Sequence, residues 1–312
     1  MTGIRLFSSV LAALLAAAAV APPLRAQVPT FGTRSNLVVL SATAVDKAGR
    51  PVRDLRRDEL KVFDEGRPQP IQHFKPSREL PARVLLLVDA SGSMNGELKS
   101  ASARMAAVQI MAALGAEDQV ALAGFDHKYW GIVAFTQDRA SIEKGFEELT
   151  PFGSTALHDA LDKAARDLAS HGEGRRAVVV ITDGIDTASQ LQAEAVIARS
   201  RALDVPIYTL SVLSTLDDPK SRYFVGRQRT SAGAEGAGVL SRYAQMSGGA
   251  SFVVSDFRGL KLAADQIAGE LKHQYRLGYD PPSTPAHFRR IEVRTTRKGV
   301  IVKTRRGYLP PT

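Results

Sequence analysis

The chain has 312 residues, of which 44% are apolar and 23% charged, a composition that excludes global disorder and a multi-span membrane protein. It has no cysteine, which excludes disulfides, thiolate zinc sites and cysteine nucleophiles. The net charge of +9 is concentrated in residues 271–312, which carry ten Lys and Arg against two Asp and Glu, so it does not predict a nucleic-acid-binding protein.

The N-terminal segment has the pattern of a secretory signal peptide. Arg5 precedes an apolar, alanine-rich run at residues 10–20, and the small residue Ala26 ends the segment. This run is shorter than the roughly 20 residues that cross a membrane. We predict that residues 1–26 are a signal peptide cleaved after Ala26, and that the rest is exported to the periplasm or the cell exterior with no stable membrane anchor. An uncleaved N-terminal anchor is the alternative.

Residues 27–80 are predicted to form a β-rich region. Residues 36–45 are rich in β-branched side chains, which favour a strand. Residues 61–63 and 71–74 flank a turn-forming segment at 64–69, a pattern that predicts a hairpin. Such a short region is not expected to be stable alone.

Residues 81–271 are predicted to form an α/β domain with a doubly wound, mostly parallel sheet. Apolar runs of strand length alternate with segments of helical periodicity. Strands are expected at 83–88, 120–125, 132–135, 176–182, 205–212 and 250–254, and helices at 98–114, 141–149, 156–169, 188–202, 240–246 and 260–271. Residues 214–238 have little apolar content and are predicted to be an exposed loop, either a tolerated insertion or a specificity loop.

Residues 272–312 are predicted to return to β structure. Strands are expected at 275–279, 290–296 and 300–306, the last two as a hairpin around residues 297–299. We expect this segment to pack with residues 27–80 as one β-rich domain into which the α/β domain is inserted. Its basic side chains are expected on the solvent face of the hairpin, or else in a patch for anionic ligands.

Oxygen-bearing side chains follow the first strand of the α/β domain. Asp89 ends this strand, and Ser91 and Ser93 come two and four residues later. Ligands of open α/β sheets bind at the carboxyl ends of the strands. Carboxylate and hydroxyl oxygens suit Mg²⁺, Mn²⁺ or Ca²⁺, and they suit zinc and copper poorly. The motif therefore predicts a site for a hard divalent cation.

Two further segments have the same design. Thr155 comes just before a predicted helix, and Asp183 follows another apolar strand. Together the five residues Asp89, Ser91, Ser93, Thr155 and Asp183 resemble the metal-ion-dependent adhesion site of von Willebrand factor type A domains. The resemblance covers about residues 82–271. Short flanking segments such as residues 45–52 also resemble those of the exported bacterial "VWFA-related" proteins best known from acidobacteria.

The resemblance implies binding and not turnover, with Mg²⁺ as the expected ion and Mn²⁺ or Ca²⁺ as alternatives. In such domains the metal keeps an open position for an Asp or Glu carboxylate of a partner protein. The two serines would coordinate directly, Thr155 directly or through water, and the two aspartates directly or through the metal's waters. Two other functions stay open: a structural or assembly module with an incidental metal, and a metal-assisted hydrolase, for which the sequence shows no general base.

Overall fold

The computed structural model describes residues 37–76, 81–95, 97–172, 174–212, 231–282 and 287–309. The predicted signal peptide and its cleavage site lie outside these ranges, as do residues 214–230 of the predicted loop. Across the described ranges, no helix combines the length and the apolar character that crossing a membrane requires. Residues 36–312 form one compact unit.

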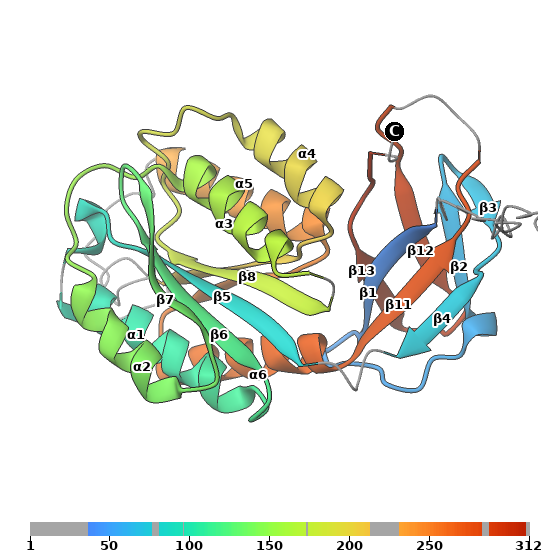
Figure 1. Cartoon of the computed structure of the whole chain (residues 1–312), viewed down its shortest axis with the longest axis horizontal. Coiled ribbons are helices and arrows are strands. Elements are labelled where there is room, and N and C mark those ends of the chain that lie inside the picture. The colour runs from blue at the N-terminus through green and yellow to red at the C-terminus, as the bar shows by residue number, and fades with distance from the viewer. Residues whose placement is uncertain are drawn as a thin grey trace, which may run out of the picture. The chain divides into compact units, whose positions relative to one another are not determined.

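A six-stranded sheet forms the centre of the α/β part (Figure 1). Its strands are β5 (Ala82–Asp89), β6 (Gln119–Phe125), β7 (Tyr129–Thr136), β8 (Arg175–Thr182), β9 (Ile207–Val212) and β10 (Ser251–Val254). They lie in the order β10-β9-β8-β5-β6-β7, and all pairs are parallel except β6 with β7. The predicted α/β class and mostly parallel sheet are confirmed.

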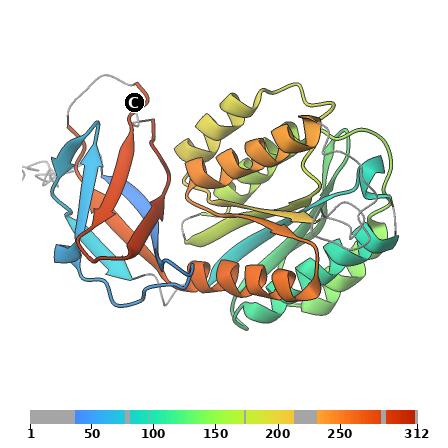
Figure 2. The ribbon, with the colours of Figure 1, turned by 180° about the vertical axis from the view of Figure 1, so that it is seen from behind.

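Helices cover both faces of this sheet (Figures 1 and 2). They are α1 (Glu97–Ala113), α2 (Arg139–Gly145), α3 (Leu157–Ser170), α4 (Ala193–Leu203), α5 (Ser231–Ser247) and α6 (Phe257–Lys272), with short 3-10 turns η1 (Arg57–Glu59), η2 (Gly92–Met94) and η3 (Phe146–Glu148). Apolar side chains of α1, α2 and α6 belong to one buried cluster, and those of α3, α4 and α5 belong to another.

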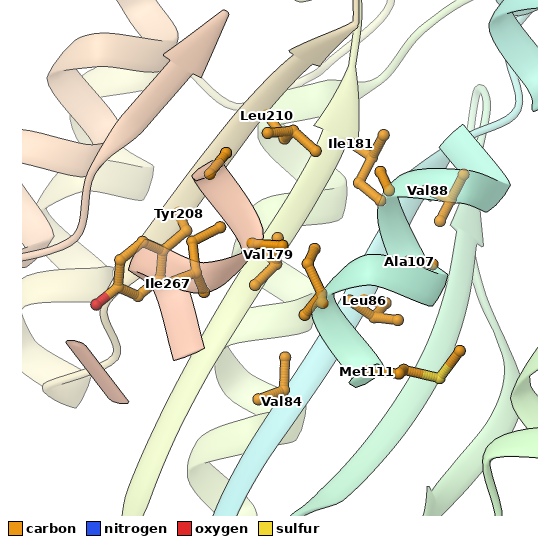
Figure 3. Close-up of a cluster of buried hydrophobic side chains, with 14 of the residues drawn as sticks. Val84, Leu86, Val88, Ala107, Met111, Val179, Ile181, Tyr208, Leu210 and Ile267 are labelled. Carbon is orange, nitrogen blue, oxygen red and sulfur yellow. The ribbon is translucent and has the colours of Figure 1, made fainter. Parts of the chain in front are cut away.

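Burial on both faces explains why the strands are apolar throughout. In β5, Val84, Leu86 and Val88 pack into the first cluster, while Leu85 and Leu87 pack into the second. Figure 3 shows the first cluster, in which β5 and β8 side chains lie among Ala107 and Met111 of α1 and Ile267 of α6. Every position of such a strand loses apolar surface to water, which is the main stabilisation of the sheet.

The two largest differences from the predicted helix boundaries lie at the starts of α5 and α4. Residues 231–238, predicted as loop, form the first half of α5. Their Gly- and Ala-rich composition carries no helical periodicity, yet it lets the helix approach the chain closely at Gly184. The helix predicted from residue 188 begins only at Ala193, because Gln190 and Leu191 donate their backbone N–H groups to Asp159 of α3 instead.

The β-rich part combines strands from both ends of the chain. Its strands are β1 (Val38–Asp46), β2 (Leu60–Asp64), β3 (Arg67–Gln69), β4 (His73–Pro76), β11 (Gln274–Tyr279), β12 (Ile291–Thr295) and β13 (Val300–Thr304). They form one sheet of order β13-β1-β11-β4 and a second of order β12-β2-β3. The two sheets contribute to a single buried cluster that includes Leu40, Val62 and Leu277.

Both predicted hairpins are wrong in their pairing. Strand β2 pairs with β3, and β4 pairs with β11 in the other sheet. Likewise β12 pairs with β2, and β13 pairs with β1. The apolar residues of β12 and β13 do contribute to the same core, but from two different sheets. Alternation of apolar residues indicates which face is buried, and it does not distinguish a neighbour in a sheet from a neighbour across a core.

The basic residues of the C-terminal segment pair largely within the molecule. Arg289 and Arg305 are buried, which corrects the expectation that these side chains line a solvent face. Arg289 Nε lies 2.7 Å from Asp64 Oδ1, Arg297 pairs with Asp54 and Glu59, and Lys303 pairs with the buried Glu270. Much of the local charge is therefore neutralised by carboxylates from elsewhere in the chain.

Candidate metal centre

The sheet topology brings Asp89 and Asp183 to one edge. Asp89 is the last residue of β5, and Asp183 directly follows β8, its parallel neighbour, in which Ile181 lies opposite Val88. The chain leaves β5 toward β6 on one side and later returns to β8 on the other. In an open α/β sheet, such a reversal of strand order leaves a crevice at the carboxyl ends of the strands.

Backbone hydrogen bonds tie the three predicted ligand segments together. Gly92 N donates to Gly153 O at 2.9 Å, and Phe152 N donates to Ala90 O at 2.8 Å, which joins the segment after β5 to the segment before α3. Thr187 N in turn donates to Thr155 O at 2.8 Å, which joins the segment before α3 to the one after β8. The predicted ligand residues therefore lie on segments whose relative positions are fixed by the main chain.

Asp89 is buried, with 3% of its surface exposed. Its Oδ1 accepts a hydrogen bond from Ser91 N at 2.8 Å. Burial raises its pKa to about 6, because desolvation outweighs the hydrogen bonds from Ser91 and Thr182; the nearby negative charge of Asp183 acts in the same direction. The ionised form of Asp89 is therefore poorly solvated.

The hydroxyl groups differ in exposure. Ser91 is fully buried and Thr155 nearly so, whereas Ser93 is exposed. Ser91 Oγ and Ser93 Oγ lie 3.0 Å apart, a hydrogen-bond distance. The turn after β5 therefore places two hydroxyl oxygens side by side, one at the base of the site and one open to solvent.

Asp183 has one carboxylate oxygen that is left unsatisfied within the described part of the chain. Its Oδ1 is buried and has no hydrogen-bond partner among the described residues. Buried carboxylate oxygens normally have partners, so an orphaned one indicates a missing ion or water. Together with the neighbouring carboxylate and hydroxyl oxygens, it suits a hard divalent cation. The described residues hold no cluster of three or more His, Cys, Asp or Glu, so a cation here would depend on the hydroxyl ligands.

Sequence reasoning missed two residues of this site. Thr182 Oγ1 donates to Asp89 Oδ2 at 2.5 Å and accepts from Gly184 N at 3.0 Å, so it orients the buried carboxylate. Lys99, in the first turn of α1, places its Nζ 3.0 Å from Asp183 Oδ2. A hydroxyl at the end of β8, directly before Asp183, was the available signal for Thr182. No local pattern pairs Lys99 with a residue 84 positions away.

Asp186 and His158 lie next to this site but have other partners. Asp186 Oδ1 accepts from Ser189 Oγ at 2.5 Å and from His158 N, at the start of α3, at 3.3 Å. The imidazole Nδ1 of His158 lies 2.9 Å from Tyr243 OH of α5. These contacts hold α3, α5 and the segment after β8 together, which gives both residues a structural role.

Residues 84–185 match the family model of the von Willebrand factor type A domain. The matched range begins inside β5, ends two residues after Asp183, and contains all five predicted ligand residues. This chain contains a von Willebrand factor type A domain. The match covers about a third of the chain and does not extend to the β-rich flanks, so the closer resemblance to the exported acidobacterial proteins stays a prediction.

This chain resembles one curated protein in sequence and several solved structures in fold. The uncharacterized protein sll0103 of Synechocystis is 31% identical over 110 residues, which are 34% of this chain and 26% of that protein. The chain thus matches about a quarter of that relative's length.

Among solved structures, a von Willebrand factor type A protein from Catenulispora acidiphila is 12% identical and has a TM-score of 0.50, with 89% of this chain and 75% of that one covered. An aerotolerance-related membrane protein from Bacteroides fragilis is 21% identical with a TM-score of 0.49, covering 61% of this chain and 98% of that one. The likeness to the Catenulispora structure concerns the fold alone.

The rim of the site in this von Willebrand factor type A domain carries an exposed aromatic side chain. Phe152 is 77% exposed, and its backbone is bonded to Ala90, next to Ser91. A cavity of about 290 Å³ lies beside the site, lined by Asp89 and by apolar side chains that include Met94, Phe146 and Leu149. Exposed aromatic side chains beside a polar centre are typical of surfaces that bind proteins.

Proposed function

We propose that the von Willebrand factor type A domain of this chain binds a divalent cation through Asp89, Ser91, Ser93, Thr155 and Asp183, and binds a partner protein through that cation. The expected ion is Mg²⁺, with Mn²⁺ or Ca²⁺ as alternatives. The observation that carries the proposal is the buried Asp183 Oδ1, which lies near the buried carboxylate of Asp89 and has no hydrogen-bond partner among the residues that the structure describes. When bound, the ion would supply a Lewis-acidic position for an Asp or Glu carboxylate of the partner.

Charge balance supports binding of an acidic partner. Two carboxylates and three neutral hydroxyls neutralise a dication without excess, so the ion would keep its attraction for one more carboxylate. Phe152 would then supply an apolar contact at the rim of the site. We propose binding without turnover, since His158, the histidine nearest to the site in the sequence, is held against Tyr243 and Asp186.

Calorimetric titration tests the metal site. The protein without residues 1–26 retains the whole compact unit and is titrated with Mg²⁺, Mn²⁺ and Ca²⁺. We expect one ion to bind per chain. Asp183→Asn should weaken binding by more than about tenfold, because it removes a charged ligand oxygen.

Asp186→Asn is the matched control, because it removes a carboxylate only three residues away that accepts hydrogen bonds from Ser189 and His158. Its metal affinity should equal that of the wild type. Equal losses in the two variants would mean that the ligand set is assigned incorrectly. No binding by the wild type at millimolar ion would contradict the proposal.

Partner capture distinguishes adhesion from assembly. The wild type and Asp89→Ala are each cross-linked to proteins of the producing organism, in Mg²⁺ and in EDTA. A metal-dependent binding protein should capture partners only as the wild type in Mg²⁺. Capture that persists in EDTA and in Asp89→Ala would instead indicate an assembly module with an incidental metal.

We further propose that the chain is exported, with residues 1–26 as its signal peptide. The support is the sequence pattern of Arg5, the apolar run at 10–20 and Ala26. Expression of the full chain in a bacterium, followed by N-terminal sequencing of the protein from each compartment, tests this. Export with an N-terminus at Gln27 would agree with the proposal, and an intact N-terminus in the cytoplasmic fraction would contradict it.

A further inference from the structure

The proposed metal site already contains a cation supplied by the chain. Lys99 Nζ lies 3.0 Å from Asp183 Oδ2 and 3.1 Å from the carbonyl oxygen of Ser93. Both side chains are largely shielded, with 21% of the Lys99 side chain and 10% of the Asp183 side chain exposed. The ammonium therefore contacts one predicted ligand through its carboxylate and another through its main chain.

The position of Lys99 is costly for the helix that carries it. Lys99 is the third residue of α1, and the first turn of a helix presents unpaired N–H groups and a positive end of the helix dipole. A lysine at this position gains nothing from the helix. Its contacts with Asp183 and Ser93 are thus what holds the ammonium here.

The same oxygens would serve an ammonium or a metal ion. Asp183 Oδ2 accepts from Lys99, and its other oxygen, Oδ1, has no partner in the described ranges. An ammonium and a dication that share one carboxylate repel each other strongly in a partly buried site. The two cations therefore cannot both bind Asp183 at full strength.

We propose that Lys99 is the resident cation of this site, which neutralises Asp183 in the metal-free protein and competes with the divalent ion. The inference rests on the proposed metal site. Lys99 then has two effects of opposite sign: it stabilises the metal-free fold by compensating a shielded carboxylate, and it weakens the affinity for metal. Binding of a divalent ion becomes an exchange of cations at Asp183, so the ion binds with a lower apparent affinity than it would without Lys99.

Lys99→Met tests both effects, because it removes the charge and keeps an unbranched side chain that can cover the same surface. Calorimetric titration with Mg²⁺ and with Mn²⁺ should show binding tighter than in the wild type by about tenfold or more. In EDTA, the melting temperature of the variant should be lower than that of the wild type, and saturating Mg²⁺ should raise it by more. Lys99→Arg keeps the charge and should retain the wild-type affinity range.

Lys261→Met is the matched control. Lys261 Nζ lies 2.9 Å from Asp265 Oδ2 on α6, with both side chains about half exposed, so its removal should change neither the metal affinity nor the metal-free melting temperature. Unchanged or weaker metal binding by Lys99→Met, with normal binding by the wild type, would overturn the role of Lys99 and leave the metal site intact. If neither protein bound metal, the proposed function would fail together with this inference.

Discussion

Asp89 is a buried carboxyl group held in an environment that disfavours its charge. Burial raises its pKa to about 6, and the hydrogen bonds from Ser91 and Thr182 offset only part of this shift. A carboxyl group that titrates close to neutral pH is characteristic of functional sites, where the fold tolerates a local loss of stability. In this protein, a bound cation would restore the stability that is lost by burying the charge of Asp89.

The raised pKa of Asp89 predicts a pH-dependent effect of its removal. The folded state binds more protons than the unfolded state between about pH 4 and pH 6, so the free energy of unfolding falls as the pH rises through this range. In EDTA at pH 7.5, Asp89→Asn should therefore stabilise the protein by on the order of 2 kcal/mol. At pH 4.5 the effect should be clearly smaller, because the carboxyl of the folded wild type is then protonated and only that of the unfolded state remains largely ionised.

Thermal unfolding at both pH values, in EDTA, measures this difference. Asp265→Asn on the exposed face of α6 serves as the control, because Asp265 is half exposed and pairs with Lys261 on the same helix. An equal shift at both pH values, or destabilisation at pH 7.5, would show that the burial of Asp89 is not costly.

Helix α5 fixes the position of the segment that carries Asp183. Gly184, directly after Asp183, has a φ of +95°, a conformation that residues other than glycine rarely adopt. On α5, a Cβ added at Gly236 would lie only 2.3 Å from Gly184 O. The close approach of the helix thus depends on the absence of a side chain at position 236.

Gly236→Ala should weaken metal binding although it alters no ligand atom. The methyl group must push the helix away from residues 183–185, which displaces the carboxylate of Asp183. We expect at least a tenfold loss of Mn²⁺ affinity by calorimetry, comparable to the loss of a residue that orients a ligand. Gly238→Ala is the control on the same helix, because a Cβ there meets nothing within 4 Å. Equal affinities in the two variants would show that the close approach of α5 does not position Asp183 for metal binding.

Strand β2 is joined to the C-terminal strands by a buried polar network. Asp64, fully buried, accepts from Arg289 Nε at 2.7 Å, from Tyr279 OH at 2.9 Å and from Tyr308 OH at 3.2 Å. Burial raises the pKa of both tyrosines, so they stay neutral and donate. One carboxylate thus links strands from the two ends of the sequence.

Asp64→Ala should destabilise the protein by about 3 kcal/mol, because it removes the carboxylate that faces a buried guanidinium. Tyr308→Phe removes one hydroxyl from the same carboxylate and should cost only about 1 kcal/mol. Urea unfolding followed by circular dichroism measures both. A ranking in which Tyr308→Phe costs as much as Asp64→Ala would contradict the central role of the carboxylate.

At the scale of the whole molecule, two C-terminal side chains reach from the β-rich part to the α/β part. Arg305 Nη1 donates to the carbonyl oxygens of Arg201 and Ala202 at the end of α4, and its Nη2 donates to Val39 O of β1. Lys303 pairs with Glu270, a buried residue of α6 that also accepts from Tyr208 OH. These contacts predict that the chain unfolds as one cooperative unit.

Arg305→Met should lower the free energy of unfolding by about 2 kcal/mol, since it leaves carbonyl groups at the end of α4 without their donors. Arg306→Met, which changes an exposed neighbour, should have no measurable effect. Differential scanning calorimetry should show one transition in the wild type. Two separate transitions in the wild type would show that the β-rich and α/β parts fold independently.

The sequence by itself determined the class of the fold and the identity of the candidate ligands. Apolar runs such as residues 83–88 have the length of buried strands, and their alternation with helices favours a mostly parallel sheet. Because parallel strands end at one edge, the positions of Asp89 and Asp183 in sequence were enough to predict their location in space.

Tertiary structure alone decided which strands pair and which groups surround the ligands. The partners of β12 and β13 depend on a core built from both ends of the chain, which local alternation does not encode. In the same way, the contact between Lys99 and Asp183 and the orphaned Asp183 Oδ1 arise between residues far apart in sequence. Pairing and charge compensation are properties of distances in space, so they became visible only once the sheet and its helices were assembled.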